Sequence, residues 1–222
     1  MYLRQALATG AAALGLMLMA GHLAIVPAHQ GRGKVVHEST TATPALGYEA
    51  PAPETLGGSY ELTDHTGRTV TDETFRGRWV LMFFGFAGCR EACPVALDRM
   101  SLALDELGAL ADGIEPIFVD LDFAGPDLRG LAQFVGHFHP RLRGLTGPRK
   151  EMFSILRKFQ VRREIKHGLY GSKETGPRID HTTYFFLIDP AGKTRAYFYH
   201  TLSPAEMAAH IRHHLQPVPV AQ

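Results

Sequence analysis

Apolar residues recur along the chain in two alternating patterns, one typical of buried strands and one typical of helices. The run "RWVLMFFGFAG", which begins at Arg78, is almost continuously apolar, as expected for a central strand covered on both faces. Beyond Pro94 the apolar positions recur every three or four residues, which predicts an amphipathic helix. These positions are Leu97, Met100, Leu104 and Leu107.

The remaining elements continue this alternation. "SYELTDHTGRTVT" predicts a hairpin ahead of the first long strand, "EPIFVDLD" a strand, and "PDLRGLAQFVGHF" a helix. "GLTGPRKEMFSILRKFQV" predicts a turn and a helix, followed by a polar loop and the hairpin "TTYFFLIDPAGKTRAYFYH". In "SPAEMAAHIRHHL", Ser203 as N-cap, Pro204 at the first position and Glu206 in a capping box begin a last helix. This order predicts an α/β fold: a central mixed sheet flanked by helices, with an N-terminal β-hairpin extension.

The N-terminal part of the chain has a different composition. Residues 1–28 contain Arg4, a long apolar stretch without acids, and Val26-Pro27-Ala28, which fits either a signal peptide or a membrane anchor. Either one exports the rest of the chain. Residues 29–57 are rich in Gly, Pro, Ala and Thr, which predicts a flexible tether. We expect residues 58–215 to form the folded domain and residues 216–222 to form a short tail.

Composition narrows the classes of function. The chain has 222 residues, of which 45% are hydrophobic and 20% charged, as in globular proteins. Its net charge of +1 is near zero and therefore gives no argument for nucleic-acid binding. Only two cysteines occur, Cys89 and Cys93.

Both cysteines fall where the first long strand gives way to the helix, with Pro94 directly after the second. Pro94 suits the first helical position, so we expect Cys93 at or near the N-cap. The positive end of a helix favours a thiolate, which is both a redox nucleophile and a metal ligand. A structural disulfide, a redox-active pair and a metal site are therefore the three alternatives. A disulfide closing so small a loop constrains the unfolded chain little, which disfavours the first.

A third ligand is available in "GPRIDHTTYFFLIDPAGK". A cysteine motif at a strand-to-helix junction suggests a thioredoxin-like fold, in which the loop entering the strand "TYFFLID" lies beside the cysteine loop. His181 holds the place where thiol-exchange enzymes have a cis-proline. Two thiolates and an imidazole suit Cu(I) and, with a further ligand, Cu(II).

Three segments in order, "FFGFAGCREACP", "FHPRLRGLTG" and "IDHTTYFFLIDPAGK", resemble the Sco/SenC family of copper-binding, thioredoxin-like proteins. The resemblance implies that Cys89, Cys93 and His181 bind copper and that Asp180 lies close by. Asp180 then either orients His181 by accepting a hydrogen bond from its ring, or caps a turn. The folded unit at residues 58–215 would be a thioredoxin-like copper-binding domain.

The resemblance also implies a function and a location. It predicts a metallochaperone that delivers copper to the binuclear copper site of cytochrome c oxidase, or to another exported cuproprotein, and can reduce the cysteines of that site. The domain would be tethered to a membrane at the periplasmic face, or less readily in the mitochondrial intermembrane space. The alternative is a thiol–disulfide oxidoreductase acting on an exported partner through Cys89 and Cys93, which can form a disulfide with each other.

Overall fold

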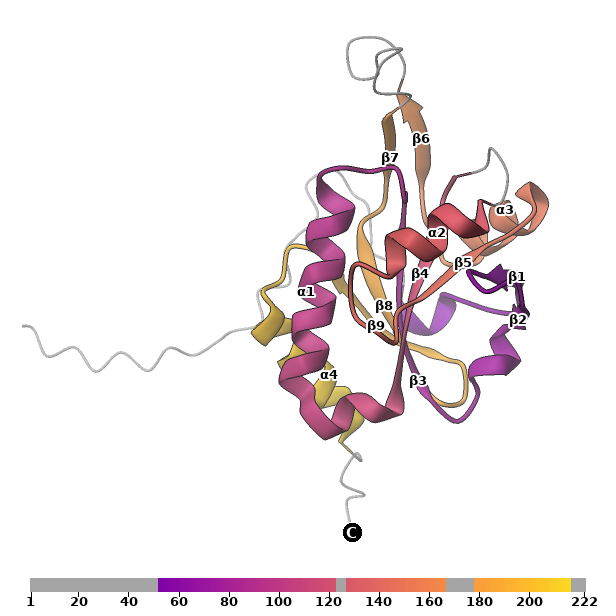
Figure 1. The fold of residues 1–222 in the computed structure, drawn as a ribbon. Coiled ribbons are helices and arrows are strands. Elements are labelled where there is room, and N and C mark those ends of the chain that lie inside the picture. Colours follow the sequence, from indigo (N-terminus) through magenta and orange to yellow (C-terminus); the bar gives the residue numbers. More distant parts are fainter. Residues whose placement is uncertain (1–51, 123–126, 167–177, 217–222) are drawn as a thin grey trace, which may run out of the picture. The chain divides into compact units, whose positions relative to one another are not determined.

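The computed structural model describes residues 52–122, 127–166 and 178–216, which belong to one compact unit spanning residues 48–222. Strands and helices alternate along this unit (Figure 1). The strands are β1 (Glu61–Asp64), β2 (Thr69–Thr71), β3 (Trp79–Gly85), β4 (Ile114–Asp120), β5 (Arg143–Thr146), β6 (Arg163–Lys166), β7 (Arg178–His181), β8 (Tyr184–Ile188) and β9 (Thr194–Tyr199). The α-helices are α1 (Ala92–Leu107), α2 (Leu128–Val135), α3 (Arg149–Lys158) and α4 (Pro204–Leu215).

Seven strands form one mixed sheet in the order β2-β1-β5-β4-β3-β8-β9. Strands β3, β4 and β5 are parallel, whereas β8 runs antiparallel to β3 and β1 antiparallel to β5. The predicted N-terminal hairpin is β1–β2, and it extends this sheet at one edge. The predicted mixed central sheet flanked by helices is therefore confirmed.

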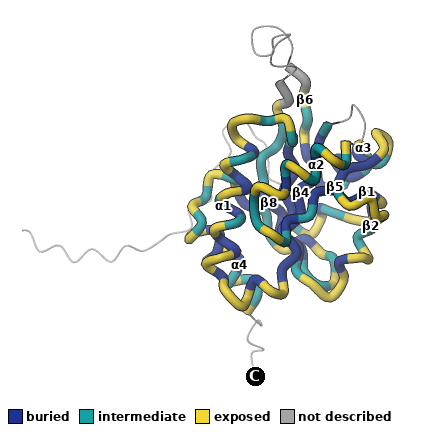
Figure 2. Tube along the Cα trace, viewed as in Figure 1, coloured by how far each residue is buried: buried dark blue, intermediate teal, exposed yellow. Residues whose placement is uncertain are grey.

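Two apolar cores lie on opposite faces of the sheet. Leu81 and Phe83 face α1, α2 and α4, while Val80, Met82 and Phe84 face α3. Because both faces are covered, β3 and β4 are buried along almost their whole length, as Figure 2 shows in dark blue for β4. This explains the continuous apolar runs in the sequence.

At least one residue that the sequence analysis placed in the tether packs against the folded domain. Leu56 is buried, and its carbonyl accepts a hydrogen bond of 2.9 Å from the Thr194 hydroxyl. Residues 1–51, which include the predicted signal peptide or anchor, lie outside the described residues. Among the helices that are described, none is long and apolar enough to span a bilayer.

Three short elements differ from the sequence prediction. "GLTG" was expected to be a turn, but Arg143–Thr146 forms β5, the link between β4 and the hairpin. The segment expected to be a polar loop before His181 contains β6 and β7, which form a separate two-stranded ribbon. The backbone pairing runs from Arg163 opposite His181 to Lys166 opposite Arg178, and no alternating apolar pattern in the sequence marked it.

Helix α1 begins earlier than predicted. Its N-cap is Glu91, so Cys93 is the second helical residue and Pro94 the third. Proline is tolerated there because the first four N–H groups of a helix have no intrahelical acceptor. The N-terminus of α4 agrees with the prediction, with Ser203 as N-cap, Pro204 first and a capping box with Glu206.

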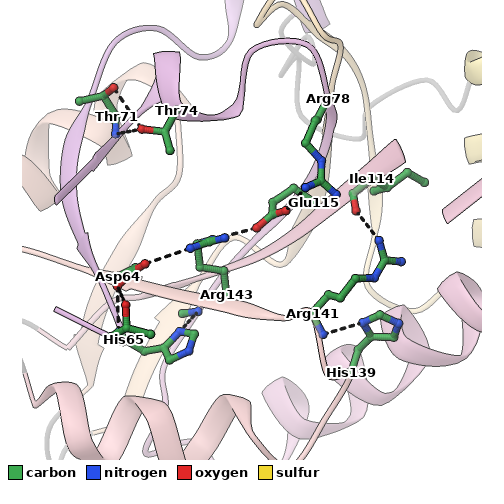
Figure 3. A network of polar contacts seen from close by, with 12 residues as sticks. Asp64, His65, Thr71, Thr74, Arg78, Ile114, Glu115, His139, Arg141 and Arg143 are labelled. Atoms are coloured by element: carbon green, nitrogen blue, oxygen red, sulfur yellow. Dashed lines mark hydrogen bonds and ion pairs between the residues drawn. The ribbon is translucent and has the colours of Figure 1, made fainter. Parts of the chain in front are cut away.

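Four charged side chains join β1, β4, β5 and the turn before β3 (Figure 3). Arg143 donates from Nη1 to Asp64 at 2.9 Å and from Nε to Glu115 at 2.8 Å, and Arg78 lies 3.1 Å from the other Glu115 oxygen. Burial alone would raise the pKa of Asp64, but hydrogen bonds from Thr66, Arg68 and Arg143 lower it to about 2. Since this pKa lies below the unfolded value of about 3.9, the carboxylate stabilises the fold above about pH 4, and that contribution is lost as the pH falls toward 2.

Removing Arg143 should destabilise the fold strongly, because it leaves the buried Asp64 without an ion pair and Glu115 with Arg78 alone. For Arg143→Leu we expect the free energy of unfolding, measured by urea denaturation, to fall by about 3 kcal/mol. Arg129→Leu, at an exposed position on α2, is the matched control and should change it by no more than about 0.5 kcal/mol. Equal effects of the two variants would show that the network does not stabilise the sheet.

Candidate metal centre

The two cysteines lie on either side of the start of α1, just beyond the end of β3. Cys89 is half-buried in the connecting loop, and Cys93 is fully buried in the first turn of the helix. Both are free thiols. The backbone N–H of Phe86 points at the sulfur of Cys93 at 3.5 Å. Cys93 is therefore held within the fold, while Cys89 is the more accessible thiol.

The close approach of strand and helix depends on Gly85. A β-carbon at this position would lie 2.6 Å from a ring carbon of Phe118 and 3.2 Å from the sulfur of Cys93. The first distance is shorter than real contacts of this kind. The absence of a side chain at Gly85 thus lets Cys93 pack against the end of β3.

His181 ends β7 and reaches the buried cysteine from the opposite side. Its Nε2 lies 3.7 Å from the sulfur of Cys93, and its ring packs edge-on against Phe83 with centroids 6.3 Å apart. Its Nδ1 lies 2.9 Å from the carbonyl oxygen of Thr182, so Nδ1 carries the proton and donates. Burial lowers the pKa of His181, which favours the neutral ring. The lone pair of Nε2 therefore faces Cys93, as a metal ligand requires.

Asp180 is exposed and lies opposite Glu164 in the β6–β7 ribbon. Its charge raises the pKa of His181, though less than burial lowers it. The Nδ1 hydrogen of His181, which a neighbouring carboxylate could accept, goes to the Thr182 carbonyl in this structure. That Asp180 orients His181 stays a prediction.

The two thiols have opposite acidities. The Cys93 thiol, as a hydrogen-bond donor, lowers the pKa of Cys89 to about 5, aided by backbone N–H groups of Glu91, Ala92 and Cys93 and opposed by burial. The same hydrogen bond, together with burial, raises the pKa of Cys93. At neutral pH Cys89 is therefore a thiolate, and it accepts a hydrogen bond from the protonated Cys93 thiol.

Asp120, which the sequence analysis did not single out, fixes the cysteine loop from β4. Its Oδ1 accepts hydrogen bonds from the backbone N–H groups of Ala87 at 3.0 Å and Asp122 at 3.2 Å. Burial raises the pKa of Asp120 to about 6, although these two donors lower it. The sequence feature that could have pointed to Asp120 is an acidic residue at the end of the predicted buried strand "EPIFVD".

Two thiols and an imidazole could hold a soft or borderline metal ion here. Bonds of about 2.3 Å to sulfur and about 2.0 Å to nitrogen, separated by about 120°, put the two donors about 3.7 Å apart, which matches the Cys93–His181 spacing. Within the described residues, no three His, Cys, Asp or Glu side chains yet close around a single point. Cys89, Cys93 and His181 would be the residues that hold such an ion.

A groove of about 720 Å³ begins at His181 and runs along the other face of β8 and β9. Tyr184, Tyr197 and Tyr199 line it on the sheet side, and the ring centroid of Tyr184 lies 5.2 and 4.8 Å from those of the other two. The rest of its lining includes Phe159, Gln160 and residues 162–164. The groove brings solvent and potential partners to the histidine side of the site.

Comparison with known proteins identifies the family to which this arrangement belongs. A sequence model described as SCO1/SenC matches residues 49–216. The chain is 37% identical over 139 residues to Protein sco1 of Schizosaccharomyces pombe, a match that covers 62% of this chain and 52% of that protein. It is 34% identical over 166 residues to the human protein SCO1 homolog, mitochondrial, covering 73% and 54%. The chain thus spans about half the length of these curated relatives.

Solved structures of Sco proteins also resemble this chain in fold. The structure of Bradyrhizobium japonicum ScoI with copper bound has a TM-score of 0.64 at 29% identity and covers 72% of this chain and 99% of that one. Yeast Sco1 with copper bound has a TM-score of 0.66 at 26% identity, covering 74% and 91%. These likenesses confirm the predicted thioredoxin-like fold. Because the family model spans nearly all of the compact unit, including both cysteines and His181, this chain belongs to the SCO1/SenC family.

Proposed function

We propose that this protein is a copper metallochaperone that carries copper on Cys89, Cys93 and His181. It delivers the ion to the binuclear copper site of cytochrome c oxidase and can reduce the cysteines of that site. The observation that carries the proposal is the 3.7 Å approach of His181 Nε2 to the sulfur of Cys93, with the Cys89 thiolate beside them. The copper-bound ScoI and Sco1 structures support copper as the cargo.

The donor set favours copper over other common ions. Thiolate sulfur and imidazole nitrogen are soft to borderline ligands, which select Cu(I). Cu(I) accepts three ligands, whereas zinc in a structural site usually takes four. A further ligand from solvent or a partner would allow Cu(II) to be held at the same place.

The unequal burial of the ligands suits transfer. Cys93 is fully buried, whereas Cys89 and His181 are half-buried. A recipient thiolate can approach Cys89 and replace it as a ligand while the buried Cys93 still holds the ion. The protein thus binds copper firmly while leaving one bond open to exchange.

The place of action follows from the N-terminal segment. Residues 1–28, as signal peptide or anchor, would carry the folded domain across a membrane, and the tether would let it reach partners. We place the domain at the periplasmic face of the inner membrane. There it would meet the copper-site subunit of the oxidase or another exported cuproprotein.

A second function, thiol–disulfide exchange, is favoured by the acidities of the two thiols. Cys89, with its pKa of about 5, would attack a partner disulfide, releasing one partner thiolate and forming a mixed disulfide. Cys93 would then lose its proton and attack Cys89, which frees the second partner thiolate and leaves a Cys89–Cys93 disulfide. Each cycle oxidises the pair and reduces one partner disulfide, so an external thiol reductant must restore it.

The copper proposal predicts that all three ligands are needed. In an anaerobic Cu(I) titration against a competing chelator, the reduced protein should bind one copper tightly. His181→Ala and Cys89→Ser should each weaken binding by at least about 100-fold, because loss of a ligand exceeds the 10–100-fold cost of losing a group behind one.

The matched control is His213→Ala, which removes an exposed histidine from α4 and should leave copper affinity unchanged. If His181→Ala keeps full affinity, the three-ligand site is wrong. If Cys89→Ser alone loses copper, the histidine is not a ligand and the exchange reaction becomes the better account.

The thiol acidities predict a pH dependence of alkylation. Cys89 in the reduced, metal-free protein should react with iodoacetamide at half its maximal rate near pH 5, because the thiolate is the nucleophile. Cys93→Ala removes the main hydrogen-bond donor and should move this midpoint toward the ordinary value of about 8.5. Mass spectrometry identifies the modified residue. A wild-type midpoint near 8.5, or no shift in Cys93→Ala, would contradict the proposed hydrogen bond between the thiols.

A further inference from the structure

Positive charge is concentrated in one segment of the chain. Residues 149–163 contain six of the 23 Lys and Arg residues but only one acid, Glu151. Since the whole chain carries a net charge of +1, the rest of it is net negative. This segment comprises α3, the turn after it and the first residue of β6, so these six cations are close together in the chain with only one acid among them.

Four arginines of this segment gather around one exposed phenylalanine. Phe153, Arg157, Arg162 and Arg163 line a groove of about 410 Å³, and the Arg149 guanidinium lies 5.5 Å above the Phe153 ring. We call these five residues the arginine groove. They combine an apolar floor with planar cations, and Phe153 is 39% exposed.

The cations of the arginine groove lie close enough to affect one another. Burial lowers the pKa of Arg163, and the nearby charge of Arg149 lowers it further, against the opposite effect of Asp122. Within the described residues Arg149 and Arg157 form no ion pair. Their charge is therefore available to a partner, whereas Arg163 also donates from Nε to the Leu121 carbonyl at 3.1 Å.

The arginine groove continues into the groove that ends at His181. Both are lined by Gln160, Arg162 and Arg163, and the second runs on past Thr182 to His181. A chain lying in the arginine groove would thus follow a hollow surface to the histidine side of the metal centre. Glu164 and Asp180 line the end near His181, so the positive charge is greatest at the α3 end.

We propose that the arginine groove docks an acidic polypeptide segment of the protein that exchanges copper with this one, and so holds the recipient beside His181. Guanidinium groups bind carboxylates in a planar, two-pronged manner, and Phe153 offers an apolar contact between them. A concave groove suits a peptide chain better than a flat bilayer surface. The inference rests on the proposed function for its partner, but the binding of acidic peptide does not depend on copper.

The test uses the full chain in detergent and a short fluorescein-labelled peptide of alternating Glu and Ala as the probe. Fluorescence anisotropy should show binding at low ionic strength that weakens as salt is added, because the contacts are between exposed charges. The uncharged peptide of alternating Gln and Ala should not bind. The double variant Arg149→Gln/Arg157→Gln should bind the Glu peptide about tenfold more weakly, as expected for the loss of two exposed charge pairs.

The matched control is Arg68→Gln/Arg129→Gln, which removes the same charge from exposed positions on the β1–β2 turn and α2. It should keep wild-type affinity. Equal losses in both double variants would mean that net charge alone attracts the peptide and would overturn the proposal. Far-UV circular dichroism and thermal unfolding of each variant check that it is folded.

Copper binding separates this inference from the proposed function. Arg149→Gln/Arg157→Gln should bind Cu(I) like the wild type, and His181→Ala should bind the peptide like the wild type. Wild-type copper binding without peptide binding would overturn the docking inference alone. Peptide binding without copper binding would leave the groove standing and reject the chaperone. Binding to vesicles containing anionic lipid but not to the peptide would overturn it in favour of a membrane contact.

Discussion

The antiparallel pairing of β3 with β8 is the constraint on which the metal centre depends. Phe83 lies opposite Phe185 in this register, and their rings stack with centroids 4.8 Å apart. The chain that leaves the end of β3 toward the cysteines is therefore beside the chain that enters β8 from His181. A slip of β8 by one residue against β3 would turn Phe185 toward the opposite core while Phe83 stays in place, so the same packing that buries the sheet also sets the distance between sulfur and imidazole.

The site is asymmetric, and this asymmetry suits an exchangeable ion. Cys93 is enclosed by the fold and bonded to the Phe86 N–H, while Cys89 is half-buried and acidic. The Thr182 carbonyl sets the tautomer of His181, so the Nε2 lone pair faces the sulfur of Cys93.

The sequence predicted those parts of the fold that leave a periodic or local signal. The continuous apolar run of β3 and the capping box of α4 identified their elements correctly, and motif order identified the family. The sequence did not predict β5, because its partner β1 is distant along the chain. It did not predict β6 and β7, which pair with each other, because no alternating apolar pattern marks them. The sequence did not predict the role of Asp120 for a similar reason. Its carboxylate accepts a hydrogen bond from the backbone of Ala87, which lies near it only in the folded chain, and a second from Asp122. The arginine groove could not be predicted from the sequence either, because residues of α3 and the start of β6 line one groove only in the folded chain.

The most direct test of the central claim is X-ray absorption at the copper edge of the full chain loaded with Cu(I). The account predicts sulfur scattering from two thiolates together with the multiple-scattering pattern of one imidazole, and loss of that pattern in His181→Ala. A spectrum with sulfur ligands alone, or an imidazole pattern that persists in His181→Ala, would contradict the assignment of Cys89, Cys93 and His181 as the copper site.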